Sequence, residues 1–561
     1  MGNAILQFLL ILMLLFVVAV PLAKYLHLAF SRENTKLDRF FFPFEKFIYR
    51  VAGIKNLEET GWKKYSLALL FANAALLVIS YLILRVQTFL PLNPGKIANM
   101  EPMLSFNTAV SFMTNTNLQH YSGETGLTIL TQMIFVTMMM FTSASTGLAV
   151  AIAVIRALSS KGKTIGNFYQ DYIRANVRVL LPLAVIVTLF LVAFGVPQTL
   201  DASTSVTTLE GKVQIIAMGP VASLESIKHI GTNGGGFFGV NAAHPFENPN
   251  AVTNILHILA MWCIPAALPI TYGLMVKNRK QGWVLFGTML AIFLVMLTVI
   301  YCAEQAGNPA LNNEGFSSTQ GSMEGKEVRF GIPLSSFFTA LTTAATTGTV
   351  NNMHDTLTPI GSLVPFGLMM LNNVFGGEGV GFVNLLMYAI LAVFLAGLMV
   401  GRTPEFLGRK IEPREMKLIV IALLIHPLII LGPSAIAFMT HLGTDAISNA
   451  GFHGISQVIY EFTSAGANNG SGFEGLGDNT PFWNISTGVV MLLGRYISII
   501  ALLAVAGSLT QKQPVPETIG TFRTDNATFG IILIGTVLII GALTFFPVLV
   551  LGPIAEFLSI R

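Results

Sequence analysis

The chain has 561 residues, of which 53% are hydrophobic and only 11% are charged, and its formal net charge is +4. Soluble domains carry about 25% charged residues. The composition therefore excludes a soluble globular protein and predicts an all-α polytopic membrane protein.

Ten stretches are long and apolar enough to cross a membrane, since a spanning helix needs about 20 apolar residues. In chain order they cover residues 3–23, 66–84, 126–155, 179–200, 251–276, 282–303, 356–401, 418–440, 484–509 and 527–553. The stretch 356–401 is too long for one straight span, and we interpret it as a single span broken at Asn372–Gly381, NNVFGGEGVG. Unwound backbone at this depth is tolerated only where it is buried in protein or lines a watery cavity.

The basic residues predict the orientation of these spans. The alternate loops hold 24 of the 32 Lys and Arg, and these loops are 24–64, 156–178, 277–280, 402–417 and 510–525. Cytoplasmic loops are enriched in Lys and Arg. These loops are therefore predicted to face the cytoplasm, and both termini are predicted to lie outside.

Each of the four long outer segments contains a short apolar helix followed by a tract of Thr, Ser, Asn and Gly. These segments are Ser105–Asn117, Ala222–Gly236, Phe337–Val350 and Ser456–Ser471. They recur at intervals of 118, 114 and 122 residues, counted between Thr116, Gly234, Gly348 and Gly470. This recurrence, with one span before each tract and one after, predicts a duplicated unit of span, re-entrant half-helix, filter strand and span.

Four such pseudo-symmetric units account for eight spans, and one extra span lies at each end of the chain. The predicted organisation is an N-terminal helix 1–26, a basic cytoplasmic loop 27–64, repeats 65–158, 170–280, 281–402 and 416–510, and a C-terminal helix 526–561. The broken span is the second span of the third repeat.

The four tracts are predicted to form a central selectivity filter. Each half-helix would point its negative C-terminal end toward the membrane centre, where free carbonyls favour a cation. The predicted ion-binding residues are Asn115, Thr116, Asn117, Thr232, Asn233, Gly234, Gly235, Thr346, Thr347, Gly348, Asn468, Asn469 and Gly470. Mostly neutral groups argue against a divalent cation, which usually requires carboxylates. Backbone carbonyls suit a large monovalent cation.

Two motifs then indicate a family. GTNGGGFFG (Gly231–Gly239) followed by AHPFENP (Ala243–Pro249) is a highly specific combination, and TNTNLQHYSGE (Thr114–Glu124) and the third and fourth tracts support it. Across essentially the whole chain, the sequence resembles the KdpA family, the A subunits of the bacterial Kdp potassium-transporting ATPase. This family belongs to a superfamily that includes the Trk, Ktr and HKT transporters.

The resemblance implies a potassium-binding subunit in the bacterial cytoplasmic membrane. It would take external K⁺ into its filter and pass the ion through an intramembrane tunnel to a P-type ATPase subunit similar to KdpB. A single-span KdpC-like subunit and a small KdpF-like peptide would complete the complex, surrounded by membrane lipids. K⁺ would be the transported ion, and neither another cofactor nor a nucleic acid is expected.

The resemblance also implies roles for single residues. Gly234, Gly348 and Gly470 would be filter positions, with Thr116 in the fourth place. Gln119 would influence selectivity, and the broken span would supply a gating loop below the filter that includes Gly376 and Gly377. In this chain the loop also carries an extra acid, Glu378, outside the family pattern.

Two charged residues lie inside predicted spans. Arg495 lies in the middle of the span 484–509, where a charge is costly and usually functional. It could repel ions, tune occupancy or brace the filter, whereas the alternative is an arginine that extends to an interface. Glu378 could lie near a cation path, or it could cap the second half of the broken helix.

The sequence contains no recognisable ATP site. GKT at Gly162–Thr164 follows Ala157, where a phosphate-binding loop requires its first glycine, and the Asp-Lys-Thr-Gly sequence of P-type pumps is absent. The chain is therefore predicted to be non-catalytic, and uphill transport would need a partner. The alternatives are a self-sufficient Trk- or Ktr-type K⁺ channel or uniporter, a polytopic membrane enzyme and a structural scaffold.

Overall fold

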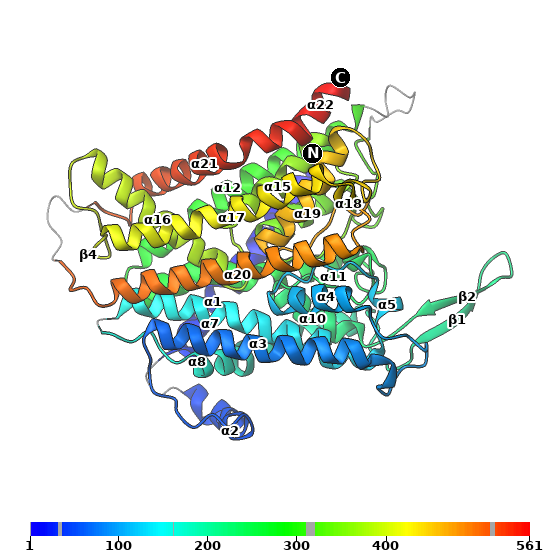
Figure 1. Cartoon of the computed structure of the whole chain (residues 1–561), viewed down its shortest axis with the longest axis horizontal. Coiled ribbons are helices and arrows are strands. Elements are labelled where there is room, and N and C mark those ends of the chain that lie inside the picture. The colour runs from blue at the N-terminus through cyan, green and yellow to red at the C-terminus, as the bar shows by residue number, and fades with distance from the viewer. Residues whose placement is uncertain (1, 32–35, 161, 310–319, 516–521, 561) are drawn as a thin grey trace.

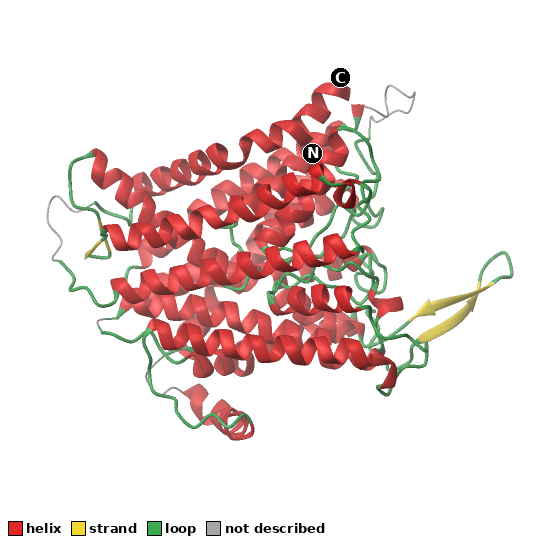
Figure 2. Ribbon diagram, viewed as in Figure 1, coloured by secondary structure: helices red, strands yellow, loops and turns green. Residues whose placement is uncertain are grey.

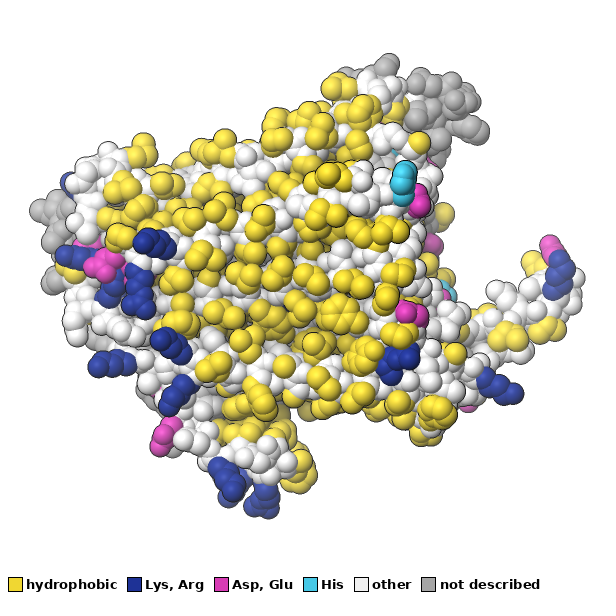
Figure 3. Space-filling view, in the orientation of Figure 1, with side chains coloured by type: hydrophobic (Ala, Val, Ile, Leu, Met, Phe, Trp, Pro, Cys, Tyr) yellow, Lys and Arg dark blue, Asp and Glu magenta, His cyan; other side chains and the backbone are white. Residues whose placement is uncertain are grey.

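The computed structural model describes residues 2–31, 36–160, 162–309, 320–515 and 522–560. Its helices form one bundle, and an antiparallel hairpin of β1 (Ser203–Thr207) and β2 (Val213–Ala217) projects from one end (Figure 1). Both termini lie towards that end (Figure 1). Hydrophobic side chains cover the middle of the bundle, whereas Lys and Arg gather towards the opposite end (Figure 3). The bundle therefore has the apolar belt and the one-sided positive charge of a membrane protein.

Within the described ranges, ten helices are long and apolar enough to cross a membrane, which confirms the predicted number. They are α1 (Gly2–Ala29), α3 with η1 (Trp62–Phe89), α6 to α7 (Ile129–Ser159), α8 to α9 (Phe168–Ala193), α11 (Ala251–Met275), α12 (Arg279–Ala306), α16 (Val380–Met399), α17 (Pro413–Met439), α20 (Pro481–Leu509) and α21 to α22 (Ala527–Ile560). The spans that contain α7, α11 and α16 are mostly buried, whereas those of α1 and α21 are mostly exposed. The first three therefore lie at the centre of the bundle.

The beginnings of several helices follow from local sequence. The Thr480 side chain caps α20 by accepting from the backbone N–H of Trp483, and Pro481 occupies the first helical position. Asn250 caps α11 in a reciprocal capping box with Thr253. Such side chains satisfy backbone N–H groups that have no partner inside the helix.

Four short helices lie among the spans of this mostly helical bundle (Figure 2). They are α4 (Pro102–Met113), α10 (Val221–Ile230), α14 (Gly331–Ala344) and α19 (Phe452–Ala467). With 10 to 16 residues they reach at most about 24 Å at 1.5 Å per residue. This is shorter than the hydrocarbon core of about 30 Å. Each helix ends where one of the four polar tracts begins.

The predicted break in the long apolar stretch 356–401 is confirmed. Helix α15 (Pro359–Leu371) ends at Asn372, whose φ of 46° is left-handed, and α16 begins at Val380. The Asn384 side chain donates to the carbonyl of Asn372 over 3.0 Å and so stabilises the end of α15. The loop between the two half-helices is buried in protein, as unwound backbone at such depth requires.

Several elements lie outside the predicted spans and tracts. The hairpin β1–β2 was not predicted, nor was α2 (Lys36–Val51) inside the basic segment 24–64. Helix α2 packs beside the bundle through Arg178, which forms ion pairs with Glu45 and, at 2.7 Å, with Asp38. The remaining short elements are α5 (Gly123–Gly126), η4 (Asn241–Ala243), β3 (Glu405–Phe406), β4 (Arg409–Lys410) and α18 (His441–Thr444).

Candidate functional site

The four polar tracts share one backbone hydrogen bond. In each tract, an N–H donates to the carbonyl of the residue five positions earlier, at the end of the preceding short helix. The bonds are Thr116 to Ser111 at 2.9 Å, Asn233 to Lys228 at 2.9 Å, Thr347 to Thr342 at 2.8 Å and Asn469 to Ser464 at 2.9 Å. These four donors therefore occupy the same position in their tracts.

Left-handed backbone flanks this shared position in every tract. The residue before it has a positive φ at Asn115, Thr232, Thr346 and Asn468, and the residue after it has a positive φ at Asn117, Gly234, Gly348 and Gly470. The predicted alignment of Thr116 with the three glycines is therefore wrong by one residue. Asn117 takes that place, since it follows the shared hydrogen-bond donor Thr116 and has a φ of 57°.

Close contacts join the four tracts into a closed ring. Glycine is required at three of these contacts, since a β-carbon on Gly234 would overlap the carbonyl oxygen of Thr347. In the same way, Gly348 faces the carbonyl of Asn469, and Gly470 faces that of Thr116. The last contact, between the first and second tracts, is made by the amide of Asn233, which donates to Asn115 Oδ1 over 2.6 Å.

Asparagine side chains tie the ring together from within the protein. Asn115 donates to the carbonyls of Gly231 at 3.2 Å and Thr232 at 3.0 Å. Asn468 donates to Thr116 Oγ1 at 2.9 Å, and Asn469 donates to the carbonyl of Thr342 at 2.9 Å. These side chains therefore connect neighbouring tracts rather than standing free.

Gln119 and Gly235 also lie against the second tract. The Gln119 amide forms two hydrogen bonds with the backbone of Gly236, accepting from its N–H at 2.8 Å and donating to its carbonyl at 3.2 Å. A β-carbon on Gly235 would lie 2.7 Å from the ring of Phe112. Gln119 thus fixes the strand that follows the ring residues.

A buried group of charges behind the second tract was missed by sequence reasoning. Lys228 of α10 lies 2.7 Å from Glu225 and 2.6 Å from Glu247, and all three side chains are buried. Glu247 Oε1 also accepts from the N–H of Phe238 at 2.8 Å. The spacing of Glu225 and Lys228 on one helix face was a visible signal, whereas the approach of Glu247, which the motif AHPFENP contains, depends on tertiary structure.

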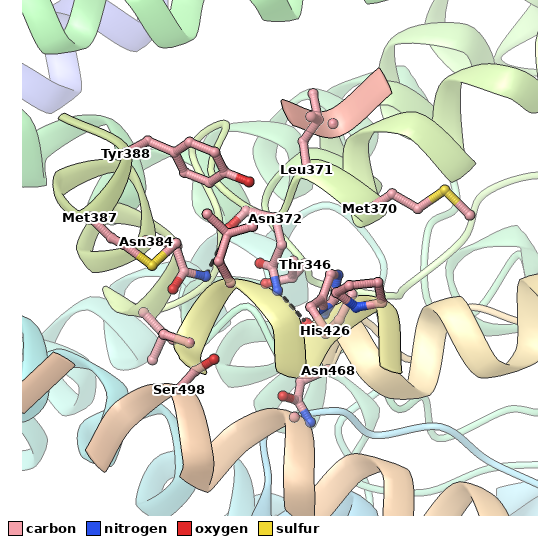
Figure 4. A pocket seen from close by; sticks show the side chains of 18 of the residues that line it. Thr346, Met370, Leu371, Asn372, Asn384, Met387, Tyr388, His426, Asn468 and Ser498 are labelled. Carbon is pink, nitrogen blue, oxygen red and sulfur yellow. Dashed lines mark hydrogen bonds between the residues drawn. The ribbon is translucent and has the colours of Figure 1, made fainter. Parts of the chain in front are cut away.

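Below the ring lies a cavity of about 40 Å³, which Figure 4 shows from close by. Thr346 and Asn468 line it from the ring, and Asn372 and Asn384 line it from the two half-helices of the broken span. Arg495 of α20 also lines this cavity, and its side chain is buried. The predicted position of Arg495 deep in the bundle is confirmed, and extension to a surface does not occur.

The loop of the broken span lies directly against the ring. The N–H of Gly377 donates to the carbonyl of Ala345 at 2.8 Å, at the end of α14. A β-carbon on Gly376 would lie 3.0 Å from Gly381, so the loop is closely packed. Glu378 is fully buried, and both of its carboxylate oxygens have no hydrogen-bond partner among the described residues.

The Glu378 carboxylate is therefore not a hydrogen-bonding cap of α16, whose N-cap residue is Gly379. The sequence left two roles open for Glu378, a place near a cation path and a cap of the second half-helix. The geometry argues against a cap made by a hydrogen bond.

Comparison with known proteins identifies the family of the chain. The family profile described as potassium-transporting ATPase A subunit, KdpA, matches residues 9–558. The chain is similar to the potassium-transporting ATPase potassium-binding subunit of Geobacillus kaustophilus (strain HTA426), with 74% identity over 561 residues and full coverage of both chains. The chain therefore belongs to the KdpA family of potassium-transporting ATPase A subunits.

Proposed function

We propose that this chain is the potassium-binding, non-catalytic subunit of an ATP-driven K⁺ uptake system. The observation that carries the proposal is the closed ring of four tracts, in which three glycines face the backbone carbonyls of neighbouring tracts. A ring of carbonyl oxygens can replace the hydration shell of a monovalent cation. The relative from Geobacillus kaustophilus bears the name of a potassium-binding subunit.

Within the proposed filter, the thirteen residues predicted from the four tracts divide into two roles. The backbone of the ring would supply the ion ligands. The side chains of Asn115, Asn233, Asn468 and Asn469 would hold the tracts together, since the first three donate to a neighbouring tract and Asn469 donates to the short helix before one. Gln119 would influence selectivity by fixing the backbone of Gly236.

The four-repeat organisation also belongs to this proposal. The shared hydrogen bond and the shared pattern of positive φ support equivalent units around one axis. The basic loops would face the cytoplasm and both termini would lie outside, so that K⁺ enters the ring from the extracellular side. The extra helices 1–26 and 526–561 would flank the four repeats.

Beyond the ring, K⁺ would enter the cavity beside Arg495 and the loop Asn372–Gly379. The loop would act as the gate, and a tunnel within the membrane would lead the ion to a KdpB-like P-type ATPase subunit. KdpC-like and KdpF-like subunits would complete the complex. The rival proposal, a self-sufficient channel of the Trk or Ktr type, needs a continuous path past this loop and no catalytic partner.

Reconstitution distinguishes these two proposals. K⁺ uptake into proteoliposomes would be measured with this chain alone and with its co-purified partners, with and without ATP. Uptake that requires both the partners and ATP supports the pump subunit. If the isolated chain passes K⁺ down its gradient as fast as the complex does, the pump proposal fails and the channel is the better description.

Substitution of Glu378 by Gln tests whether the buried carboxylate lies on the ion path. We expect the K⁺ concentration for half-maximal uptake by the complex to stay unchanged. The Glu378 carboxylate forms no hydrogen bond with the ring among the described residues. The maximal rate should fall, because an unpaired buried carboxylate attracts a passing cation. An unchanged maximal rate at equal protein abundance would contradict a place on the path.

A further inference from the structure

The outer side of the ring opens into a second cavity of about 370 Å³. Gly348 and Gly470 line it from the ring, and Gln119, His120 and Asp478 line it from the loops that follow the first and fourth tracts. The cavity is open to solvent through these loops, and the Asp478 side chain is 26% exposed. Solutes outside the ring can therefore reach the side chains on its wall.

The imidazole of His120 is held in a defined orientation on this wall. Its Nδ1 lies 2.8 Å from Asn484 Oδ1 in α20, and the amide nitrogen of Asn484 donates to Asn479 Oδ1 at 3.1 Å. Since Asn484 Oδ1 is then an acceptor, His120 Nδ1 carries the hydrogen and donates. A second hydrogen bond of this kind is what orients metal-binding histidines and leaves Nε2 as the ligand atom.

Two carboxylates converge on Nε2 of His120. Glu461 Oε1 in α19 lies 3.1 Å from it, and Asp478 Oδ2 lies 3.8 Å from it. One ligand atom from each of the three residues lies within 4.8 Å of the others. Three ligands at about 2.0–2.2 Å from a tetrahedral zinc ion lie about 3.3–3.6 Å apart. The two separations from Nε2 are thus close to those of a metal site, and all three remain within 4.8 Å before any adjustment of the side chains.

Glu461 has unused capacity for a ligand. Its side chain is only 1% exposed, and its Oε2 has no hydrogen-bond partner among the described residues. A buried carboxylate oxygen without a partner is costly. A cation bound between Glu461, His120 and Asp478 would remove this cost, and a water molecule from the outer cavity could supply the fourth ligand.

We propose that His120, Glu461 and Asp478 form a site for a divalent transition-metal cation, of which Zn²⁺ is the best fit, beside the extracellular mouth of the ring. One imidazole with two carboxylates suits zinc better than calcium or magnesium, which prefer oxygen ligands alone. The site lies outside the ring and uses none of the thirteen predicted ion-binding residues.

Zinc at this site would change the local charge. A bound Zn²⁺ ion brings two positive charges to the wall of the outer cavity, so this wall becomes more positive even when the ion displaces a proton from the imidazole.

The added charge has a consequence for transport, which rests on the proposed function. A positive charge at the mouth of the ring lowers the local concentration of K⁺. Zinc should therefore raise the K⁺ concentration for half-maximal uptake by the complex without lowering the maximal rate.

The site can be tested by equilibrium zinc binding to the purified complex, measured by calorimetry with ZnCl₂ as the only added ligand. We expect His120→Gln and Asp478→Asn each to weaken this binding by at least about tenfold, as loss of metal-site residues commonly does. Asp478→Asn changes a partly exposed loop residue and keeps its size, so it remains informative if His120→Gln does not fold. MgCl₂ and CaCl₂ should not compete at equal concentration.

His453→Gln provides a matched control. His453 also lies between two carboxylates, but it uses Nε2 for Asp355 and Nδ1 for Glu556, each at 3.0 Å. Those two carboxylates lie at opposite nitrogens of the His453 imidazole, so they cannot bind one metal ion together with it. His453→Gln should therefore bind zinc as the wild type does. Equal zinc binding by the wild type and Asp478→Asn, or no binding by the wild type, would overturn the zinc site. Failure of the proposed potassium function would instead appear as a loss of K⁺ uptake in the absence of zinc.

Discussion

Substitution of Gly234 by alanine is expected to raise the K⁺ concentration for half-maximal uptake by at least about tenfold. Gly234 has a φ of 112°, which a residue with a β-carbon rarely adopts. The added methyl group would also overlap the carbonyl oxygen of Thr347 in the next tract. Strained backbone alone costs about 1–3 kcal/mol, and about 1.4 kcal/mol corresponds to a tenfold change in an equilibrium constant. Because the strain acts on the ring itself, it should appear in ion affinity.

The measurement is K⁺-dependent ATP hydrolysis and uptake by the reconstituted complex at matched abundance. Gly195→Ala is the control, because Gly195 also has a positive φ, 99°, but a β-carbon there would meet open space. This control carries the backbone strain without the contact to a neighbouring carbonyl. If Gly234→Ala and Gly195→Ala gave the same half-saturation for K⁺ as the wild type, the ring would not be the site that determines affinity.

The spans and the break were predictable because they depend on local composition. Runs of about 20 apolar residues identify helices that cross the membrane, and the loop Asn372–Gly379 carries the glycine and asparagine that end a helix. The ten spans and the break therefore appear near their expected places. The largest shift is in the fourth span, which begins at Phe168 and ends at Ala193 instead of covering 179–200.

The alignment of the first tract illustrates what local composition could not decide. The sequence Asn115–Asn117 has no glycine, so the position equivalent to Gly234 could not be recognised by residue type alone. The sign of φ decides it, because Asn117 is left-handed, with a φ of 57°, as Gly234 is. The register of this tract also depends on the hydrogen bond of Thr116 to Ser111, which the sequence alone does not show.

Contacts between distant segments were beyond sequence reasoning. In the group Glu225, Lys228 and Glu247, only Glu247 lies outside α10, whereas the group His120, Glu461 and Asp478 joins residues from different parts of the chain. In the second group, His120 and Glu461 are separated by 341 positions. Charge pairs of this kind are set by packing, since a buried charge needs a partner wherever the fold can supply one.

Substitution of Arg495 by alanine is expected to lower the maximal rate of K⁺ uptake by about tenfold with little change in protein abundance. Arg495 lines the cavity below the ring, so its charge raises the energy of a K⁺ ion there. Conduction requires that an ion be bound weakly enough to leave. Without Arg495, K⁺ would settle in the cavity, and about 1.4 kcal/mol of extra binding would retain it about tenfold longer.

Arg495 also forms a hydrogen bond that could support the ring. Two further variants separate the effect of this hydrogen bond from the effect of the positive charge. Its Nη2 donates to the carbonyl of Ser143 at 3.3 Å, and Ser143 Oγ in turn donates to Asn115 Oδ1 at 2.8 Å. Arg495→Lys keeps the charge and should retain most of the rate, whereas Arg495→Gln keeps a hydrogen-bond donor and should behave as alanine does. The reverse order would assign Arg495 to bracing the ring through Ser143. Equal uptake by the wild type and Arg495→Ala at equal abundance would exclude both roles.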